Sequence, residues 1–447
     1  MATILEQIVQ QKRQDLAALK ARYPKAESSP LPPSSRSLAA SLQQGSGFIL
    51  ECKKASPSKG LIRADFDPLT LAQTYAPYAS AISVLTDEPY FQGHPDYLAA
   101  VAQQVDKPVL MKDFFIDPMQ VRLARYLGAD AILLMLSILD DHQYQQLAAL
   151  AGELGLDVLT EVANEQERDR AVALGAAIIG INNRNLHDMS IDLARTLSLA
   201  ATIPADRIIV SESGIRRHDD VRHLRGIAQG FLVGSELMAQ ADVDLACRRL
   251  IYGEHKVCGL TRPADARAAY NAGACYGGLI FAASPRQVTL AEAAVIKAAA
   301  PLAYVGVFAN SSVDTVATVA KQLQLHAIQL HGDEDQQFIT ALRQHLALPI
   351  WKAASIDNPD PAGADRLVLD SRHAGQFGGT GRTFDWQQFK GAEVPVMLAG
   401  GIGPDNVQAA LGIPGIRGLD LNSQLESAPG IKDPALIRLT FERMKLA

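Results

Sequence analysis

The chain has 447 residues, a net charge of −6 and the composition of an ordinary globular protein, with 48% apolar and 20% charged residues. Its length exceeds what one hydrophobic core usually supports, so two domains are expected. The acidic balance disfavours nucleic acid and acidic membranes as partners. Residues 1–16 lack the apolar core of a secretion signal, and no apolar run is long enough to span a bilayer, so we expect a cytoplasmic protein.

The chain contains four cysteines, Cys52, Cys247, Cys258 and Cys275, none of which belongs to a C-x-x-C pair. Their spacing indicates neither a disulfide framework nor a zinc site. No cluster of His, Cys and Asp has metal-ligand spacing, so no metal and no other cofactor is expected.

The N-terminal segment is expected to precede the first domain as an extension over residues 1–45. Apolar residues at Ile4, Ile8, Leu16 and Leu19 alternate with charges, which predicts a helix over residues 4–22 that Pro24 ends. The Pro- and Ser-rich stretch that follows, PKAESSPLPPSSRS, predicts an extended connector.

Two series of eight short apolar segments come next, separated by stretches rich in Ala, Leu and charges. The first series is FILECKK from 48, AISVLTD from 81, PVLMKDF from 108, AILLMLS from 131, DVLTEV from 157, IIGINNR from 178, RIIVSES from 207 and GFLVGSE from 230. The second is KVCGLT from 256, YGGLIF from 276, AYVGVF from 303, AIQLHG from 327, IWKAAS from 350, RLVLDS from 366, VMLAGG from 396 and GLDLNS from 418.

Short apolar strands alternating with helices indicate parallel sheet covered on its outer face. An open doubly wound sheet would want a Gly-rich turn after its first strand, and the chain has none there. The predicted fold is therefore α/β, with two tandem (β/α)8 barrels over residues 1–253 and 254–447. Both series also end on a Gly-Ile turn followed by a strand and a Gly- or Ser-containing turn, which is typical of the phosphate site after strands seven and eight of such a barrel.

Polar side chains gather at the strand ends of the first half. Because alternate residues of a strand share a face, one mouth is expected to receive seven groups. They are Glu51, Lys53, Lys112, Glu161, Asn182, Arg184 and Glu212. Any one charge at a strand end is commonly a solvated rim residue, but seven polar groups at one end indicate a site. Lys and Glu together in a partly dry site can have pKa values pushed apart, which supplies an acid and a base.

Several motifs of this half resemble those of indole-3-glycerol-phosphate synthases. They are ILECKKASPSKG (49–60), LMKDF (110–114), LTEV (159–162), GINNRNL (180–186), SESGI (211–215) and LVGSELM (232–238). The resemblance implies closure of an indole ring, with loss of carbon dioxide and water, from a carboxyphenylamino-deoxyribulose phosphate. It implies that Lys112 is the general acid and that Glu161 is the acid or base of the dehydration. Lys53 and Arg184 would contact the anthranilate carboxylate, and Glu51, Asn182 and Glu212 would orient hydroxyls and lysines.

The same resemblance places the substrate phosphate at Ser213, Gly214, Gly234 and Ser235, where backbone N–H groups and a helix N-terminus supply positive potential. The segment 54–60, which contains Ser56 as a further substrate contact, is expected to be a mobile lid, with an ordinary surface loop as the alternative.

The second half offers a smaller set of polar strand-end residues. Alternation groups Cys258 with Lys256 and Leu260, Asp370 with Val368, and Asp420 with Asn422, while His331 and Arg286 follow two other strands. A cysteine in a strand is usually a small core side chain. A thiol opposite a carboxylate, however, can move a proton off carbon and supply one to oxygen, as an aldose-to-ketose rearrangement requires.

Motifs of this half resemble those of phosphoribosylanthranilate isomerases. They are KVCGLTR (256–262), GGLIFAASPR (277–286), QLHG (329–332), LVLD (367–370), GGTG (378–381), LAGGI (398–402) and GLDLNSQLES (418–427). The resemblance implies that Cys258 is the general base, Asp370 the general acid and Arg286 the carboxylate clamp, with His331 and Asp420 as further site residues. Gly379, Gly381, Gly401, Asn422 and Ser423 would hold the phosphate. The chain has one residue fewer than expected between Phe281 and Ser284, which questions the reach of Arg286.

The two resemblances concern consecutive reactions, so the leading hypothesis is a bifunctional tryptophan-pathway enzyme that acts on anionic phosphosugar-anthranilate substrates, as a monomer. One alternative is an unrelated pair of phosphosugar barrels, which would not be expected to carry ECKKASPSKG or KVCGLTR. A second alternative is a non-catalytic phosphate-binding scaffold. It predicts loss of the acid and base positions, yet Lys112, Glu161, Cys258 and Asp370 are all present.

Overall fold

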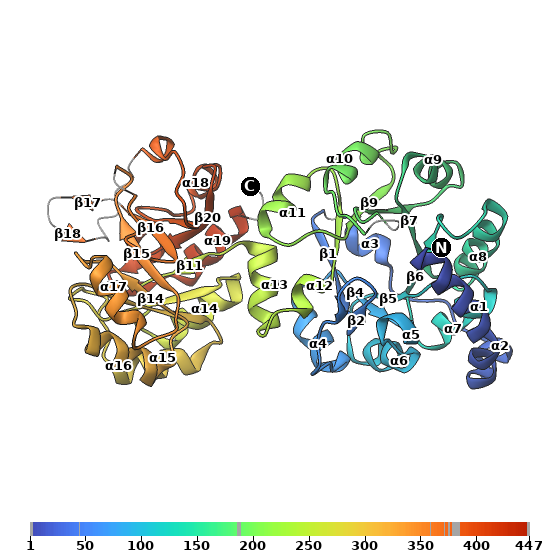
Figure 1. Ribbon diagram of the computed structural model, residues 1–447, viewed down its shortest axis with the longest axis horizontal. Coiled ribbons are helices and arrows are strands. Elements are labelled where there is room, and N and C mark those ends of the chain that lie inside the picture. The colour runs from blue at the N-terminus through green and yellow to red at the C-terminus, as the bar shows by residue number, and fades with distance from the viewer. Residues whose placement is uncertain are drawn as a thin grey trace. The chain divides into compact units, whose positions relative to one another are not determined.

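The chain forms two closed barrels, each with eight parallel strands. The computed structural model describes residues 3–43, 45–185, 189–357, 359–370, 372–373, 376–377 and 385–444. By its internal contacts the chain divides into two compact units, Met1–Cys247 and Arg248–Ala447, and one strand ring closes in each (Figure 1). The division falls within helix α13 (Val243–Tyr252). The predicted pair of (β/α)8 barrels is confirmed.

The first strand ring closes where β1 pairs with both β4 and β10. Its strands are β1 (Gly47–Cys52), β4 (Ala81–Leu85), β5 (Val109–Lys112), β6 (Ala131–Met135), β7 (Asp157–Val162), β8 (Ile178–Asn182), β9 (Ile208–Glu212) and β10 (Gly230–Val233). The helices of this unit are α1 (Ile4–Arg22), α2 (Pro24–Ser28), α3 (Leu38–Leu42), α4 (Pro68–Tyr75), α5 (Glu88–Phe91), α6 (Pro95–Gln104), α7 (Pro118–Tyr126), α8 (Asp141–Glu153), α9 (Glu165–Ala173), α10 (Ala194–Ala200), α11 (His218–Leu224) and α12 (Ser235–Met238). A small hairpin, β2 (Ala55–Ser56) with β3 (Gly60–Leu61), follows β1.

The second ring closes where β11 pairs with β12 and β20. Its strands are β11 (Lys256–Val257), β12 (Tyr276–Ile280), β13 (Ala303–Phe308), β14 (Ala327–Leu330), β15 (Ile350–Ala354), β16 (Arg366–Leu369), β19 (Val396–Leu398) and β20 (Ile416–Leu421). Its helices are α14 (Pro263–Ala272), α15 (Leu290–Ala299), α16 (Val313–Leu323), α17 (Gln336–Arg343), α18 (Val407–Leu411) and α19 (Pro434–Met444), with short 3-10 turns η1 (Trp386–Gln388) and η2 (Ser423–Leu425). Two further small hairpins are β17 (Arg372–His373) with β18 (Gln376–Phe377), and β21 (Glu426–Ala428) with β22 (Ile431–Lys432).

The N-terminal helix has the predicted bounds, but the connector after it does not. Pro24 does not simply end the helical region, because it occupies the first turn of the short helix α2. Proline is favoured there, since its missing N–H would have no helical partner at that position. The predicted extended connector therefore begins only after Ser28, and its residues 24–28 are helical.

Two helices of the first barrel, α4 and α7, begin at an Asp-Pro pair. Asp67 and Asp117 accept hydrogen bonds from the backbone N–H groups of the first helical turn, and Pro68 and Pro118 start the helices α4 and α7. An Asp N-cap satisfies donors that the helix leaves unpaired, while proline presets the backbone angle. The start of each of these two outer helices is thus determined by the residues at that position in the sequence.

The short helix α3 closes the first barrel at the end where its strands begin. Leu38 and Leu42 are completely buried and join the interior cluster that contains Ile49 and Leu232. A Cβ on Gly47 would lie 2.6 Å from Leu42 Cδ2, and one on Gly230 would lie 3.2 Å from it. Glycine at these two strand starts leaves the space that Leu42 fills, so the barrel floor is apolar and the polar mouth lies at the other end.

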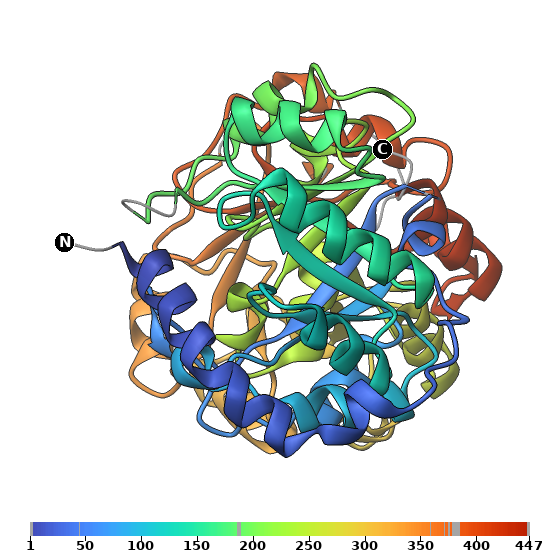
Figure 2. The ribbon, with the colours of Figure 1, turned by 90° about the vertical axis from the view of Figure 1, so that its right-hand side faces the viewer.

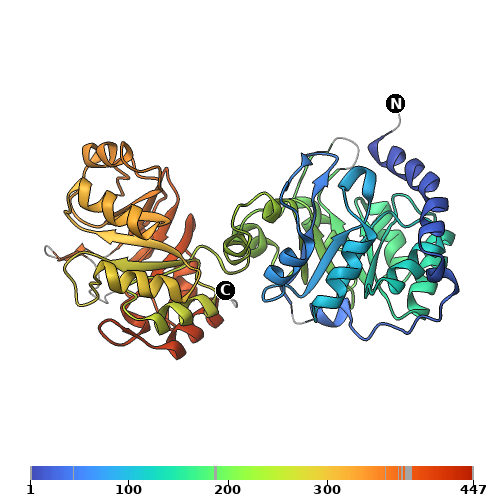
Figure 3. The same cartoon turned by 90° about the horizontal axis from the view of Figure 1, so that it is seen from below.

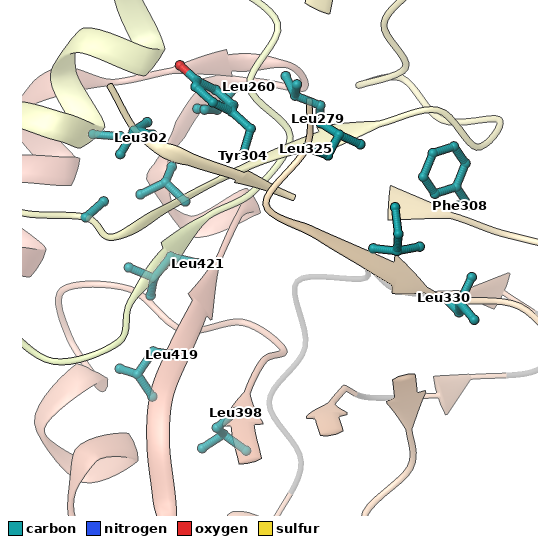
Figure 4. Close-up of a cluster of buried hydrophobic side chains, with 14 of the residues drawn as sticks. Leu260, Leu279, Leu302, Tyr304, Phe308, Leu325, Leu330, Leu398, Leu419 and Leu421 are labelled. Carbon is teal, nitrogen blue, oxygen red and sulfur yellow. The ribbon is translucent and has the colours of Figure 1, made fainter. Parts of the chain in front are cut away.

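The main core of the second barrel lies between its strands and its outer helices. It includes Val257, Leu279 and Leu419 from strands and Ile296 and Phe441 from helices. Figure 4 shows part of this cluster. One predicted grouping is wrong: Leu260 packs in this outer cluster with Val257, not on the face of Lys256 and Cys258. The strand β11 ends at Val257, and Gly259 has φ of +67°, so the alternation of faces stops there.

A buried ion cluster joins helix α1 to the first barrel. Lys12 Nζ lies 2.9 Å from Asp87 and 2.7 Å from Asp113, two residues that follow β4 and β5, and all three side chains are at least nine-tenths buried. Burial lowers the pKa of Lys12, but the carboxylates of Asp113 and Asp87 outweigh it, so the pKa stands above its usual value. Figures 2 and 3 show α1 running along the outside of this barrel. The cluster therefore ties the extension to the loops that form the mouth.

None of the helices in the described part of the chain is both long and apolar enough to cross a membrane.

Replacing Lys12 by Met should destabilise the first barrel by about 3 kcal/mol, because removing one partner of a buried ion cluster leaves its carboxylates uncompensated. The free energy of unfolding is measured in urea, with hydrogen exchange in peptides from the first unit as the readout. Lys20→Met is the matched control. Lys20 is 40% exposed and pairs with Asp117 at 3.2 Å, so its loss should cost under about 1 kcal/mol. Equal effects of the two substitutions would contradict this account.

Candidate active sites

At the mouth of the first barrel, a buried carboxylate joins two lysines. Glu51 is the penultimate residue of β1 and is 2% exposed. It accepts from Lys53 at 2.5 Å and lies 3.5 Å from Lys112, which in turn lies 3.0 Å from Glu212. Burial raises the pKa of Glu51, but Lys53 and Lys112 lower it more, so this carboxyl is ionised at neutral pH. Burial lowers the pKa of Lys112, whereas Glu212, Glu51 and Glu161 raise it more, so the ammonium group stays charged inside the mouth.

The remaining polar groups of the predicted set lie at the same mouth. Asn182 Nδ2 donates to Glu161 at 3.1 Å, and Asn182 Oδ1 accepts from the backbone N–H of Arg184 at 3.0 Å. Burial and the nearby Glu212 raise the pKa of Glu161 to about 7, although Lys112 and Asn182 act in the opposite direction. The structure thus brings together a charged lysine and a carboxyl that titrates near neutrality, which is the pairing expected of an acid–base site.

These groups surround a cavity of about 190 Å³. Its polar lining includes Lys53, Lys112, Glu161 and Arg184, and its apolar wall includes Ile4, Leu5, Ile8, Leu133 and Ile215. Helix α1 therefore supplies part of the wall, a contribution that sequence reasoning did not anticipate. Arg216 also lines the cavity and was not among the predicted residues.

The predicted phosphate residues of this half line the same cavity on its β9 and β10 side. Ser213 and Gly214 both have left-handed backbones, with φ of 63° and 87°. Gly234 follows β10, and a Cβ there would lie 2.4 Å from Glu51 Oε1, so only glycine lets the chain pass over the buried carboxylate. Ser235 begins the short helix α12. Ser56 lies in the β2–β3 hairpin and also lines the cavity, while the lid motion of residues 54–60 stays a prediction.

In the second barrel, a fully buried lysine lies below the predicted base. Lys256 Nζ donates to Asp420 at 2.8 Å and to Gln329 at 2.9 Å. Cys258 follows on the same inner face and is 5% exposed. Burial raises the pKa of the Cys258 thiol, and Lys256 and Lys432 partly oppose this, so the thiol pKa stands above its ordinary value. Cys275 is buried, like Cys52 and Cys247, and its thiol donates to the backbone carbonyl of Gly253 at 3.2 Å.

The predicted acid lies beside the predicted histidine. His331 Nε2 lies 3.6 Å from Asp370 Oδ2, and both side chains are partly exposed. Gln329 Nε2 lies 3.3 Å from His331 Nδ1. Since Lys256 can only donate, the Gln329 oxygen must face it, and the Gln329 amide then donates to His331 Nδ1. In the neutral ring the proton is therefore on Nε2, which faces Asp370.

Arg286 reaches the mouth despite the shorter loop before it. It is 9% exposed, and a Cβ on Gly259, the residue after Cys258, would lie 2.7 Å from Arg286 Cδ. Its guanidinium donates twice to Glu426, at 2.8 and 2.7 Å. Hydrogen bonding to Glu426 raises the pKa of Arg286, so the cation is permanent. Glu426 was not among the predicted site residues, although it lies within the GLDLNSQLES motif.

The predicted phosphate residues of the second half are only partly described. Gly401 has φ of 62° after β19, and Asn422 and Ser423 follow β20. Lys432 Nζ donates to Asn422 Oδ1 at 2.7 Å and to Glu426 at 2.8 Å. Lys432 is therefore a second cation of this site, in addition to the predicted Arg286, and the sequence did not predict it. Gly379 and Gly381 lie outside the described residues. Within the described ranges, no group of three or more His, Cys, Asp or Glu side chains could hold a metal ion.

Comparisons with known proteins match both halves. Residues 5–250 match the family model of indole-3-glycerol phosphate synthase, and residues 255–443 match that of N-(5'-phosphoribosyl)anthranilate isomerase. Over its whole length the chain is 50% identical to the tryptophan biosynthesis protein TrpCF of Salmonella typhi, covering 100% of both chains. It is 52% identical to TrpCF of Vibrio cholerae, covering 100% of this chain and 96% of that protein.

The chain belongs to the TrpCF family. It is a bifunctional enzyme of tryptophan biosynthesis, with a synthase domain and an isomerase domain on one polypeptide. The second half also aligns with the crystal structure of phosphoribosyl anthranilate isomerase from Thermus thermophilus, at 30% identity over 42% of this chain and 97% of that chain, with a TM-score of 0.38.

Some residues that the structure places at the two mouths of this TrpCF chain could hardly be identified as site residues from the sequence. Lys256, Gln329 and Glu426 lie inside recognised motifs, but their importance depends on partners in distant strands. Ile4, Leu5 and Ile8 read only as one face of a helix. Their position at the synthase cavity could have been found only from the way the extension packs on the barrel.

Replacing Glu161 by Gln should stabilise the synthase barrel in a pH-dependent way. Folding raises the pKa of this carboxyl from 4.5 to about 7, so its ionisation opposes folding. The cost is absent below pH 4.5, grows between pH 4.5 and 7 and is complete above 7. The substitution should therefore raise the free energy of unfolding by up to about 3 kcal/mol at pH 8 and leave it unchanged at pH 4.

The free energy of unfolding is measured in urea at both pH values, with hydrogen exchange in peptides from the synthase barrel as the readout. Both tryptophans, Trp351 and Trp386, lie in the second unit, so tryptophan fluorescence reports the isomerase barrel as an internal control. A stabilisation of equal size at pH 4 and pH 8 would show that Glu161 is not destabilised by ionisation.

Proposed function

We propose that the C-terminal barrel isomerises N-(5-phosphoribosyl)anthranilate to 1-(2-carboxyphenylamino)-1-deoxyribulose 5-phosphate, and that the N-terminal barrel converts this product to indole-3-glycerol phosphate. The observation that carries the assignment is the difference between the mouths. One holds a charged lysine among carboxylates with a carboxyl that titrates near 7, and the other holds a thiol and an aspartate. Similarity to TrpCF proteins along the whole chain supports the same assignment.

In the synthase barrel, Lys112 is the general acid at the ketone oxygen of the substrate. Its ammonium group is fixed between Glu51 and Glu212, so it presents a proton without reorganising. The ring carbon that bears the carboxylate attacks the ketone carbon as Lys112 protonates the ketone oxygen. The bond to the carboxylate then breaks, carbon dioxide leaves, and the electron pair of that bond stays in the ring and restores its aromaticity. Glu161 then transfers the proton with which the remaining hydroxyl leaves as water, a task suited to its pKa of about 7. The neighbouring CH2 carbon, which is bound to the nitrogen, loses a proton in the same elimination, and this completes the indole.

The anionic ends of the synthase substrate have separate contacts. Lys53 and Arg184, which both line the cavity, take the anthranilate carboxylate. Ser213, Gly214, Gly234 and Ser235 take the phosphate through backbone and hydroxyl donors. Glu51, Asn182 and Glu212 hold Lys112, Lys53 and Glu161 in place through the hydrogen bonds and ion pairs of the mouth. Ser56 contacts the substrate from the hairpin.

In the isomerase barrel, Asp370 donates a proton to the ribose ring oxygen as the bond from C1 to that oxygen breaks, which leaves a carbon–nitrogen double bond. The thiolate of Cys258 removes the proton from C2, and the electrons of the C2–H bond pass toward the nitrogen. The resulting enol rearranges to the ketone as C1 gains a proton. Arg286 binds the anthranilate carboxylate, with Glu426 holding its guanidinium over the mouth.

The remaining isomerase contacts follow from position. His331 and Asp420 lie beside the acid and below the base, and Gly379, Gly381, Gly401, Asn422 and Ser423 bind the phosphate. The boundary between the two catalytic domains lies between residues 253 and 254 of the chain. The enzyme acts in the cytoplasm as a monomer, needs no cofactor, and has no nucleic acid or membrane partner.

The decisive experiment separates the two activities in one chain. Phosphoribosylanthranilate is supplied, its fluorescence is followed, and indole glycerol phosphate is quantified for wild type, Cys258→Ala and Lys112→Ala. Loss of a general acid or base should lower the affected step by on the order of 100-fold or more. Cys258→Ala should block only isomerisation and Lys112→Ala only ring closure, measured with the isomerised product as substrate.

Each variant carries its own control, because the activity of the other barrel should equal that of wild type. If either folded variant lost both activities, the assignment of independent sites would be wrong. If Cys258→Ala retained full isomerase activity, the thiol would not be the base.

A further inference from the structure

Lys256 is a charged side chain enclosed within the second barrel, with no exposed surface. Enclosing an ammonium group is strongly unfavourable unless partners compensate its charge. Its partners are Asp420 at 2.8 Å, from the adjacent strand β20, and Gln329 at 2.9 Å, from β14 across the barrel. Three strands therefore fix the position of this nitrogen.

The lysine also lies against the predicted base. A Cβ on Gly278 of β12 would lie 2.7 Å from Cys258 Sγ and 2.9 Å from Lys256 Cε, so both side chains occupy the space that this glycine leaves open. Lys256 is close enough to hydrogen-bond the thiol and lowers its pKa, while Asp420 raises it.

The charge set around Cys258 comes from several elements. Arg286 follows β12 and Lys432 is on β22, and both are bound to Glu426 on β21. Asp370 and His331 form a separate pair at the mouth. Lys256 differs from Arg286 and Lys432 because it belongs to a strand of the ring, β11, whereas Arg286 and Lys432 lie in segments that follow β12 and β20.

The Lys256–Asp420 pair leaves one polar atom unused. Asp420 Oδ2 accepts from the lysine, whereas Asp420 Oδ1 is buried and has no hydrogen-bond partner. A buried pair kept only for stability would be expected to satisfy both oxygens. Because Asp420 Oδ1 has no hydrogen-bond partner beside the thiol, a role of the Lys256–Asp420 pair in the isomerase site is favoured over a purely stabilising one.

We propose that Lys256 is a positioning residue of the isomerase site, acting through Cys258: its ammonium group, held by Asp420 and Gln329, stabilises the thiolate that removes the proton from C2. The inference rests on the proposed function of Cys258 as the base. Burial favours the protonated thiol, and a fixed cation below it offsets part of the cost of ionisation without occupying the space of the substrate.

The test measures ionisation of the thiol independently of catalysis. Full-length protein is treated with iodoacetamide between pH 6 and 10, and the peptide that contains Cys258 is quantified for wild type, Lys256→Met and Asp420→Asn. Loss of the cation should move the midpoint of alkylation to higher pH by at least one unit, so that reaction at pH 8 slows about tenfold. Loss of the carboxylate should move the midpoint to lower pH.

Both substitutions destroy the same ion pair, so a merely structural role predicts the same change in both variants, and opposite shifts exclude it. Lys352→Met is the matched control. Lys352 is another buried lysine of this barrel, 3.3 Å from Glu334, and its loss should not move the Cys258 midpoint. The acid limb of the isomerase kcat/KM profile should follow the alkylation midpoint in each variant.

Two results would overturn the inference: an unchanged midpoint in Lys256→Met, or shifts in the same direction in both variants. Failure of the proposed function looks different, since Cys258→Ala would then isomerise normally whatever the alkylation profiles show.

Discussion

The constraint on which both sites depend is the burial of a lysine ammonium group among acidic partners inside a closed strand ring. Lys112 lies between Glu51 and Glu212, and Lys256 lies against Asp420. An isolated charge could not remain there, so each lysine requires carboxylates from other strands, and those carboxylates require it in return. The closed ring supplies this arrangement, because parallel strands bring their carboxyl ends to one mouth from positions far apart in the chain.

Glycines make these charged clusters sterically feasible. Gly234 lets the chain pass over the Glu51 carboxylate, and Gly278 leaves the space that Cys258 and Lys256 share. A side chain at either position would collide with Glu51 or with Cys258 and Lys256. Glycine within a strand and directly after one thus serves close approach of side chains as well as turn geometry.

The two barrels share a scaffold and differ in what their acidic and basic groups can do. In the synthase barrel, several carboxylates keep Lys112 charged while raising the pKa of Glu161 to about 7, so one cluster provides an acid and a group that can exchange a proton at neutral pH. In the isomerase barrel, the proposed reacting groups are a thiol and an aspartate, and Arg286 is paired with Glu426. Helix α1 adds an apolar wall to the first cavity, and Lys12 joins it to the loops that end β4 and β5.

The sequence by itself determined the two barrels, the strands, and most of the residues at each mouth, because strand alternation and the position of a residue at a strand end are local properties. Glu51, Lys112 and Glu161 could be placed together for that reason. These local rules gave wrong predictions at two residues that change the backbone direction. Pro24 begins a helix instead of an extended connector, and the turn at Gly259 places Leu260 in the core between strands and outer helices. Only the tertiary structure decided which groups pair across the ring, such as Lys256 with Gln329 and Arg286 with Glu426. These pairings join residues far apart in the chain, and their energies come from burial and distance, which no short stretch of sequence contains.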